Sequence, residues 1–429
     1  MSPIALLFIT LALCLVMGVP VSFSIGISCM VFLLSNGYPP LGILVQRMVG
    51  GAQSFTMMSL PMFVFAGALM AYGSTPRLMR LANMLLGRMP GGLGAAAMAT
   101  CGFFGAVSGS GVASTAAIGS IMGPEMIKQG YSRGITAGLL AAGGTMASII
   151  PPSIVMVILG VTMGTSIGKL FIAGFIPGIM AGGSLMAISY YFASKENYPR
   201  LPKAGAREKW EAFKGAFLPM VTPAIIIVGI LQGIFTATEA GGVAAFYALI
   251  LSKYVYRKLS WRRFFEICLE VAKTSAVVLF IISAASLFGW ILTSQDIPQK
   301  IAEAILGVSN NYWVVLIFFN LMLLALGTFM ETTAIILIVI PIFMPIMTQI
   351  GVDPIHLGVM VCVNMAIGAN TPPLGVDLMT ACKVADIAYE DSFRYIFFFL
   401  AAMTLVLILI IAFPQLSTWL PNMVVSSGA

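Results

Sequence analysis

The sequence predicts an all-α polytopic membrane protein made of two inverted-topology repeats, each with a re-entrant helical hairpin and a broken helix. Three observations lead to this class. Of the 429 residues, 59% are hydrophobic and only 9% are charged, whereas a soluble domain has roughly 25% charged residues. A pattern of prolines and glycines occurs twice along the chain. The lysines and arginines gather on one side of the predicted membrane.

Composition also excludes several classes of protein. The formal net charge is +7, but the basic residues lie in short loops between apolar runs. They therefore indicate membrane topology and not nucleic-acid binding. The six cysteines have no CxxC spacing, and we interpret them as small buried residues. The N-terminus has no basic segment before its first apolar run and no small-residue cleavage site, so this run is predicted to be a retained span.

The first repeat is predicted to cover residues 1–194. Its first two spans, about 4–19 and 21–34, are short, and one long kinked span is the alternative interpretation. Residues 76–89 hold three arginines among apolar residues, which is typical of an amphipathic helix at the membrane interface. The other predicted elements are a span at 54–72, a hairpin at about 91–127, a broken helix at about 131–165 and a span at 170–194.

The predicted hairpin of the first repeat has two apolar arms around the polar tip Ser108-Gly109-Ser110-Gly111. Each arm has about 15 residues, and as a helix it would be only ~22 Å long, against a hydrocarbon core of ~30 Å. Because the arms are too short to cross the membrane, we expect a hairpin that enters and returns on the same side.

The helix after this hairpin is interrupted at Pro151-Pro152. Consecutive prolines remove amide donors and push the preceding residue out of the α region, so the helix must unwind there. Irregular backbone at membrane depth is tolerated only where it is buried in protein or lines a cavity. The break is therefore predicted to belong to a binding site.

The same pattern of prolines and glycines occurs again in the second half of the chain. The matching pairs, each 221 residues apart, are Pro124 and Pro345, Gly130 and Gly351, Pro151 and Pro372, and Pro152 and Pro373. Residues 195–214 are predicted to be a cytoplasmic linker loop, and residues 215–429 the second repeat. Its predicted elements are spans at 217–234 and 240–252, a span within 264–293, a polar segment at 295–310, a hairpin at about 312–348, a broken helix at about 355–382 and a last span at 395–413.

This division gives five crossings per repeat, and an odd number inverts the second repeat relative to the first. With the N-terminus outside, only Arg47, Lys169 and Lys300 of the 22 lysines and arginines face outward, and Lys273 lies within a span. The other basic residues lie in inner loops or at inner helix ends, as the positive-inside rule requires. We therefore predict that both termini are periplasmic, that the first hairpin enters from the cytoplasm and that the second enters from outside.

Polar residues concentrate at the two hairpin tips and the two breaks. They are Ser108, Ser110, Ser114, Thr145 and Ser148 in the first half, and Thr328, Glu331, Thr332, Asn370, Thr371 and Asp377 in the second. Unwound backbone would add free carbonyl oxygens, which suit hard cations such as Na⁺, and the returning arms would offer N-terminal amides to an anion. An isolated small residue is more often a helix-packing residue, whereas intramembrane carboxylates are usually functional.

An enzyme is not predicted from this sequence. Its single histidine, His356, has no second metal ligand nearby in the pattern. No metal cluster, nucleophile triad or phosphate-binding loop is present either.

Motifs along the whole chain resemble those of one family. Residues 105–119 read GAVSGSGVASTAAIG, residues 17–23 read MGVPVSF and residues 59–63 read SLPMF, and the two Pro-Pro breaks occur in corresponding places. Together these motifs resemble the large membrane subunit, of the DctM or SiaM type, of tripartite ATP-independent periplasmic (TRAP) transporters. The resemblance implies an elevator-type transporter of the ion transporter superfamily, in which a mobile domain with both hairpins moves against a scaffold.

The resemblance also implies site residues, because in the family Na⁺ lies between each hairpin tip and the adjacent break. Carried over, the first Na⁺ site comprises Ser108, Ser110, Gly144, Ser148 and Pro151, and the second comprises Gly327, Glu331, Gly368, Asn370 and Pro372. The predicted substrate-binding residues are Ser114, Thr145, Thr332, Thr371 and Asp377.

The resemblance further implies Na⁺-coupled uptake of an organic acid anion, of the C4-dicarboxylate or sialic acid type, across the bacterial inner membrane. The expected partners are the lipid bilayer, a small four-helix membrane subunit (DctQ or SiaQ type) and a periplasmic substrate-binding protein (DctP or SiaP type). The outer segments 36–53 and 295–310 are the expected docking places. The alternatives are a self-sufficient Na⁺-coupled carrier of similar fold and a passive channel, which would need a continuous polar pathway that hairpins interrupt.

Overall fold

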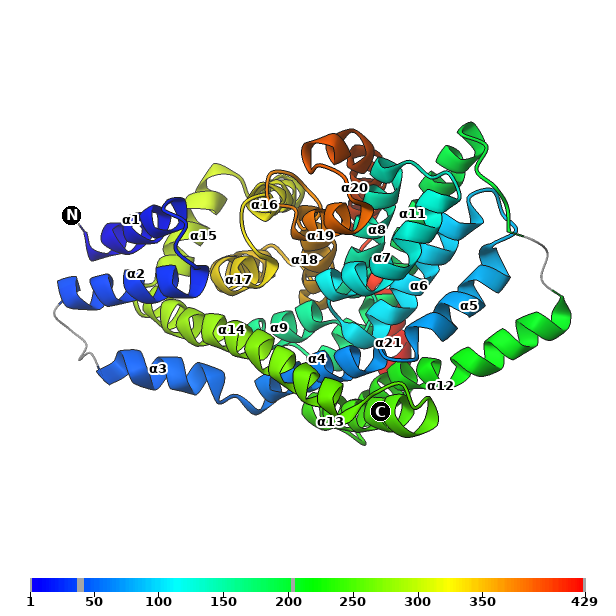
Figure 1. Cartoon of the computed structure of the whole chain (residues 1–429). Helices are drawn as coiled ribbons and strands as arrows, with labels where there is room; N and C mark the ends of the chain where they lie inside the picture. Colours follow the sequence, from blue (N-terminus) through cyan, green and yellow to red (C-terminus); the bar gives the residue numbers. More distant parts are fainter. Residues whose placement is uncertain (1, 37–41, 202–204, 427–429) are drawn as a thin grey trace.

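The computed structural model describes residues 2–36, 42–201 and 205–426, and every regular element within them is a helix (Figure 1). The predicted all-α class is therefore confirmed. The helices of the first half are α1 (Pro3–Val16), α2 (Val21–Asn36), α3 (Gly42–Ala52), α4 (Ser59–Met70), α5 (Thr75–Leu86), α6 (Gly92–Ser108), α7 (Gly111–Lys128), α8 (Arg133–Ile149), α9 (Ile154–Thr162), α10 (Ile167–Ala173) and α11 (Phe175–Lys195). Those of the second half are α12 (Ala206–Leu231), α13 (Ala237–Ile250), α14 (Trp261–Ser294), α15 (Ile297–Val308), α16 (Tyr312–Gly327), α17 (Thr332–Gln349), α18 (Pro354–Gly368), α19 (Val376–Ala385), α20 (Phe393–Ala412) and α21 (Gln415–Ser426).

Several of these helices can cross a membrane. Within the described residues, five helical stretches are long and apolar enough: Ile167–Lys195, Ala206–Leu231, Trp261–Ser294, Thr332–Gln349 and Glu390–Ala412. Others, such as α6, α16 and α18, are apolar but shorter. The protein is thus a multi-pass membrane protein, while the number and direction of the crossings stay predictions.

Helix α8 lies at the centre of the molecule. It packs against both arms of the first hairpin, α6 and α7, and against α18, α19 and α20 from the second half. All of its residues except Arg133 and Ser148 are buried. Helix α18 is likewise buried from His356 to Gly368. Glycines and alanines let these helices approach closely, as is usual where membrane helices pack.

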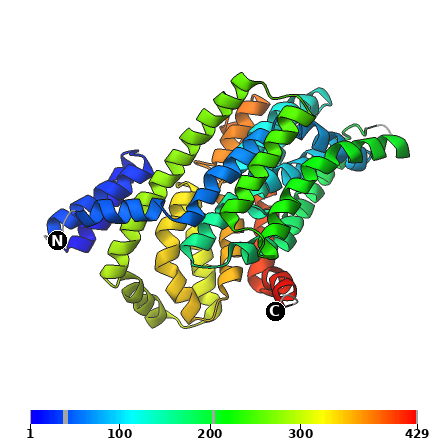
Figure 2. The ribbon, with the colours of Figure 1, turned by 90° about the horizontal axis from the view of Figure 1, so that it is seen from below.

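The N-terminal helices form one end of the molecule (Figure 1). Helices α1 and α2 pack against each other, and α2 and α3 both contact the long helix α14, which runs past them diagonally in Figure 2. Gly18, with φ of 76°, turns the chain between α1 and α2. Two packed helices are therefore present, and the alternative of one kinked span is wrong.

The two hairpins and the two broken helices have corresponding boundaries. Helices α7 and α17 begin at residues 111 and 332 and end at residues 128 and 349, and α8 and α18 begin at residues 133 and 354. Each of these pairs is 221 residues apart, the spacing of the proline pattern. The inverted orientation of the two halves in the membrane remains a prediction.

The structure differs from the sequence prediction in the linker. Residues 206–214 are not loop but the first turns of α12. By composition, their many charges are typical of a loop. The charges lie at helical spacing, with Arg207 and Glu211 paired at 3.3 Å, and Glu208 accepts a hydrogen bond from the Gly205 amide at 2.9 Å. Such contacts stabilise the start of a helix in water.

Three further segments were not anticipated as helices. Residues 42–52 of the predicted outer segment 36–53 form α3, whereas residues 37–41 lie outside the described residues. The predicted polar segment 295–310 contains the amphipathic helix α15, which packs on α17. Helix α21 follows the predicted last span, and the His356 ring nitrogen Nδ1 lies 2.7 Å from the Ser417 hydroxyl on it.

Candidate functional site

The tip of the first hairpin is a sharp, buried turn. Helix α6 ends at Ser108, Gly109 has a φ of 63°, and Ser110 accepts a hydrogen bond from the Ala113 amide at 3.4 Å as the N-cap of α7. The hydroxyls of Ser108 and Ser114 lie 2.9 Å apart, and both side chains are buried. The predicted tip residues Ser108, Ser110 and Ser114 are therefore brought together.

This tip is joined to the first break. The Gly109 carbonyl accepts a hydrogen bond from the Ile154 amide at 3.2 Å. Between α8 and α9 the axis bends by 41° around the cis Pro151-Pro152 bond, and the Ser153 hydroxyl donates to the Ser148 carbonyl at 2.8 Å. Pro151 is buried and Ser148 half-buried beside it.

Gly144 lies at a close approach between α8 and the returning arm α7. A methyl group at this position would lie 3.0 Å from the Gly111 carbonyl oxygen and would overlap the Thr115 hydroxyl. The Thr115 hydroxyl in turn donates to the Leu140 carbonyl at 3.4 Å. The glycine at position 144 therefore allows the N-terminal turn of α7 to pack closely against α8 near the break.

The second tip has the same connection to its own break. The Thr328 carbonyl accepts a hydrogen bond from the Leu374 amide at 3.1 Å. Gly327 and Gly368 touch backbone to backbone, because a methyl group on Gly327 would lie 3.0 Å from the Gly368 Cα. Both halves thus hold their tip against their break through one main-chain hydrogen bond.

Glu331 lies at the exposed side of the second tip. Its carboxylate is the N-cap of α17 and accepts from the Ala334 amide at 3.2 Å and from the Thr333 hydroxyl at 2.8 Å. Thr332 beside it is half-buried. In the described part of the chain, no hydrogen bond joins Glu331 to another predicted site residue.

Asn370 connects the second break to the first repeat. Its side-chain nitrogen Nδ2 donates to the Thr145 hydroxyl on α8 at 3.1 Å, and the residue is 1% exposed. The sequence groups Asn370 only with the second tip. In the structure, Asn370 also joins the second break to α8 of the first repeat. Its Oδ1 atom has no hydrogen-bond partner among the described residues.

Asp377 makes a second connection between the halves. It lies in the first turn of α19, is 2% exposed, and faces the start of α7, where a methyl group on Gly111 would lie 3.2 Å from its Oδ1. That oxygen also lacks a partner within the described residues. An ionised carboxylate is costly to bury alone, so this position calls for a cation, a proton or a ligand group.

The other predicted residues of the second break are less enclosed. The Thr371 hydroxyl donates to the Ile367 carbonyl at 2.7 Å, and Thr371 and Pro372 are half-buried. The Leu374 carbonyl accepts from the Tyr389 hydroxyl at 3.1 Å, so Tyr389 ties this break to the segment before α20.

Sequence reasoning missed several polar groups near the site. The hydroxyls of Thr115, Ser153 and Tyr389 each donate a hydrogen bond to a main-chain carbonyl, as described above. Asn364 on α18 donates to Asn320 on α16 at 3.0 Å and 3.2 Å, and both are buried. An amide inside an apolar helix is the signal that could have revealed this pair. Among the described residues, no cluster of His, Cys, Asp or Glu could hold a metal.

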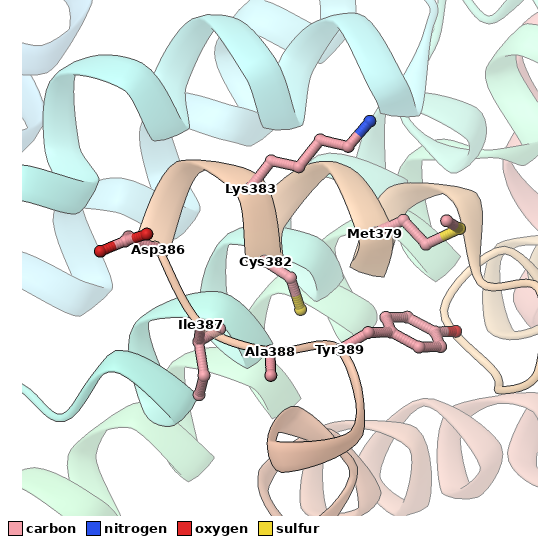
Figure 3. A pocket seen from close by; sticks show the side chains of 7 residues that line it. All are labelled: Met379, Cys382, Lys383, Asp386, Ile387, Ala388 and Tyr389. Carbon is pink, nitrogen blue, oxygen red and sulfur yellow. The ribbon is translucent and has the colours of Figure 1, made fainter.

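A separate hollow of about 530 Å³ lies at the C-terminal end of α19 (Figure 3). Lys383 and Asp386 line it, but the Lys383 side chain points away from Cys382 and Tyr389 in the close view. The Asp386 carboxylate is paired with Arg133 at the start of α8. None of the predicted site residues lines this hollow, so it is distinct from the site at the tips and breaks.

A family model matches residues 8–416 of the chain, and its description is the DctM component of tripartite ATP-independent periplasmic transporters. The sialic acid TRAP transporter large permease protein SiaM of Vibrio cholerae is 38% identical over 412 residues, which cover 96% of each chain. The C4-dicarboxylate TRAP transporter large permease protein DctM of Rhodobacter capsulatus is 36% identical over 438 residues, or 99% of each chain.

Two further similarities extend this comparison. The isethionate TRAP transporter permease protein DctMQ of Oleidesulfovibrio alaskensis is 40% identical over 414 residues, and the chain spans 95% of its own length but 65% of that relative. Among solved structures, the YdaH transporter of Alcanivorax borkumensis matches with a TM-score of 0.60, 13% identity and 88% coverage of both chains. That likeness concerns the fold alone.

Proposed function

Because the chain belongs to the DctM family of tripartite ATP-independent periplasmic transporters, we propose that it takes up an organic acid anion coupled to Na⁺ by an elevator movement. It is a transporter subunit of the bacterial inner membrane and not an enzyme. The hairpins α6–α7 and α16–α17 and the broken helices would form the mobile part, and the helices around them would form the scaffold.

One observation carries the proposal: two buried side chains at the second break, each with an unpaired oxygen, contact the first repeat. Asn370 Oδ1 and Asp377 Oδ1 both lack partners among the described residues. The Asn370 Nδ2 atom donates to Thr145 on α8, and the Asp377 carboxylate faces Gly111 at the start of α7. Hard cations take carbonyl, amide and carboxylate oxygens as ligands. The residues present therefore fit Na⁺ as a transported ion.

The arrangement also suggests how Na⁺ would favour the anion. The start of α7 presents free amides and a partial positive charge, which suits an anionic substrate. The nearby Asp377 carboxylate opposes an anion until a cation balances it. Na⁺ bound beside this carboxylate would remove this repulsion, so that the ion and the substrate bind together and move together.

The substrate class follows from the relatives and not from the site. Their names give C4-dicarboxylate, sialic acid, isethionate and 2,3-diketo-L-gulonate as substrates. We propose a small organic acid for this chain, with Ser114, Thr145 and Thr332 as neighbouring polar contacts.

The proposed partners are a small four-helix membrane subunit and a periplasmic binding protein, as in a tripartite system. In the predicted orientation, with both termini periplasmic, α15 lies on the outer side. It carries Lys300 and Glu303, so it offers the binding protein a few charges for weak, reversible docking.

Uptake into proteoliposomes tests this function. We expect the chain reconstituted with its small subunit and loaded binding protein to accumulate an organic acid when a Na⁺ gradient is imposed. Little uptake is expected without Na⁺ or from the chain alone. Equal uptake in K⁺ buffer would contradict Na⁺ coupling, and strong Na⁺-driven uptake of free substrate by the chain alone would favour the self-sufficient carrier.

A further inference from the structure

An apolar groove of about 870 Å³ runs along α20 beside the second break. Its walls are α20, the end of α16, and residues Thr371 and Pro372. The hydroxyls of Thr328 and Thr371 donate to the carbonyls of Ala325 and Ile367, both at 2.7 Å. These two threonines therefore present mainly their methyl groups to the groove.

The groove lies at membrane depth, because α20 is part of the candidate span Glu390–Ala412. Its lining extends from Phe393 to Ile408, a length of about 22 Å along a helix. One leaflet of the hydrocarbon core is about 15 Å thick. The groove is thus long enough for a chain that starts at one membrane surface and reaches the middle of the bilayer.

Arg394 is a cationic residue at the N-terminal end of α20, where the groove begins. Arg394 lies seven residues before Ala401 and fourteen before Ile408, so the three share one face of α20. Arg394 is exposed. Within the described residues no ion pair joins it to a carboxylate, although Glu390 and Asp391 precede it in sequence.

We propose that this groove binds one acyl chain of an anionic membrane phospholipid, with Arg394 holding the phosphate. A long apolar channel that ends at an unpaired cation matches a lipid, which carries an apolar chain below a charged headgroup. The bound chain covers Thr371 and Pro372 and so shields the unwound second break from mobile lipid.

Photo-crosslinking tests the proposal with the full chain in nanodiscs. The probe is a phosphatidylglycerol with a diazirine on its acyl chain, compared with the same probe built on phosphatidylcholine. We expect crosslinks in residues 400–408 of α20 and in residues 324–328 at the C-terminal end of α16 and its cap. The Ala401→Trp variant fills the groove and should reduce these crosslinks severalfold, whereas Val277→Trp on the exposed surface of α14 should not.

The headgroup is tested separately. Arg394→Gln should lower the preference for phosphatidylglycerol over phosphatidylcholine by about five-fold, the factor expected for one cation at an anionic surface. Arg88→Gln, at another exposed arginine, should leave this preference unchanged.

Three outcomes would overturn the proposal. Crosslinks spread evenly over the lipid-facing surface and unchanged in Ala401→Trp would mean annular lipid only. Equal labelling by both probes that Arg394→Gln does not alter would remove the headgroup contact. Crosslinks in the groove that disappear when the small subunit is added would mean that a protein helix occupies it. None of these outcomes bears on Na⁺ coupling, which is measured by uptake.

Discussion

The two helix breaks share a proline pair but lie in different surroundings. Pro151 and Pro152 are buried, and the first break is covered by the α10–α11 region, where a methyl group at Gly174 would lie 2.5 Å from the Ile149 carbonyl. In the second break Pro372 is half-buried and Pro373 is exposed, and an open groove runs beside it. Protein encloses most of the first break, whereas the second is partly open beside the groove.

The breaks also differ in how their free carbonyls are satisfied. Within the first break, Ser153 donates to the Ser148 carbonyl five residues earlier. In the second, the donor to Leu374 comes from Tyr389, fifteen residues later. The first break is thus closed by its own residues. The second also has hydrogen bonds of its own, such as that from the Thr371 hydroxyl to the Ile367 carbonyl, but it is held in addition by the segment that leads into α20. This difference suggests that the second break is the more adjustable of the two.

Asp377 and Asn370 belong to the second break yet contact the first repeat, and the largest expected effect concerns Asp377. Asp377→Asn keeps the side chain's size but removes its charge. If the carboxylate balances a Na⁺ ion, losing it should weaken transport by roughly 100-fold, as expected when one partner of a buried charge pair is removed. Uptake at saturating binding protein measures this effect.

The matched control is Asp391→Asn, at an exposed aspartate before α20. Its uptake should stay near that of the unmodified protein. Equal uptake by the Asp377→Asn variant would show that no transported cation depends on this carboxylate.

A second comparison separates Asn370 from the exposed second tip. Asn370→Leu removes the buried amide oxygen and leaves the Thr145 hydroxyl without its Asn370 contact. Because the loss of one polar contact to a charged group costs about 1.5–3 kcal/mol, we expect the Na⁺ concentration for half-maximal uptake to rise by roughly ten-fold or more. Glu331→Gln, at the exposed N-cap of α17, should have a smaller effect on this concentration. The reverse order would place the main Na⁺ ligands at the second tip.

The contrast between Asn370 and Glu331 shows what the sequence could reveal. The hairpins, the breaks and their 221-residue spacing were predictable, because prolines, glycines and apolar runs act locally. The hydrogen bond from Asn370 to Thr145 spans 225 residues of sequence, and nothing local in either segment indicates it. The sequence alone therefore could not show which polar residues come together in one site.

The helical start of α12 shows a different limit. A segment with so many charges is typical of a loop. It is the pairing of these charges at helical spacing that stabilises a helix there. Helix α3 was similarly missed, because Gly50 and Gly51 interrupt its apolar pattern. A methyl group at Gly51 would lie 2.7 Å from the Ser286 hydroxyl oxygen, so this glycine allows α3 to pack closely on α14.

A third prediction compares the two tips. Gly109→Ala places a side chain at a φ of 63°, which costs roughly 1–2 kcal/mol, and its methyl group would lie 3.0 Å from the Ile154 amide nitrogen. Thr328 at the second tip has an ordinary helical φ of −74°, so Thr328→Ala carries no such strain. We expect Gly109→Ala to lower the thermal unfolding temperature in detergent clearly more than Thr328→Ala does. Similar shifts would mean that the first tip relaxes freely away from the break.

The smallest expected effects come from the hydrogen bonds that close each break. Ser153→Ala and Tyr389→Phe each remove one hydroxyl from a main-chain carbonyl, a loss of about 0.5–1.5 kcal/mol. Ser153 is 1% exposed, so water cannot replace its hydroxyl, and Ser153→Ala should give the larger loss of unfolding temperature. Tyr389 is only partly buried, so the loss of its hydroxyl should cost less. If the second break is the adjustable one, Tyr389→Phe should instead increase hydrogen exchange of amides in residues 370–378 with little change in unfolding temperature. Equal exchange in both variants at their own breaks would argue against a difference in adjustability and would leave only the difference in enclosure.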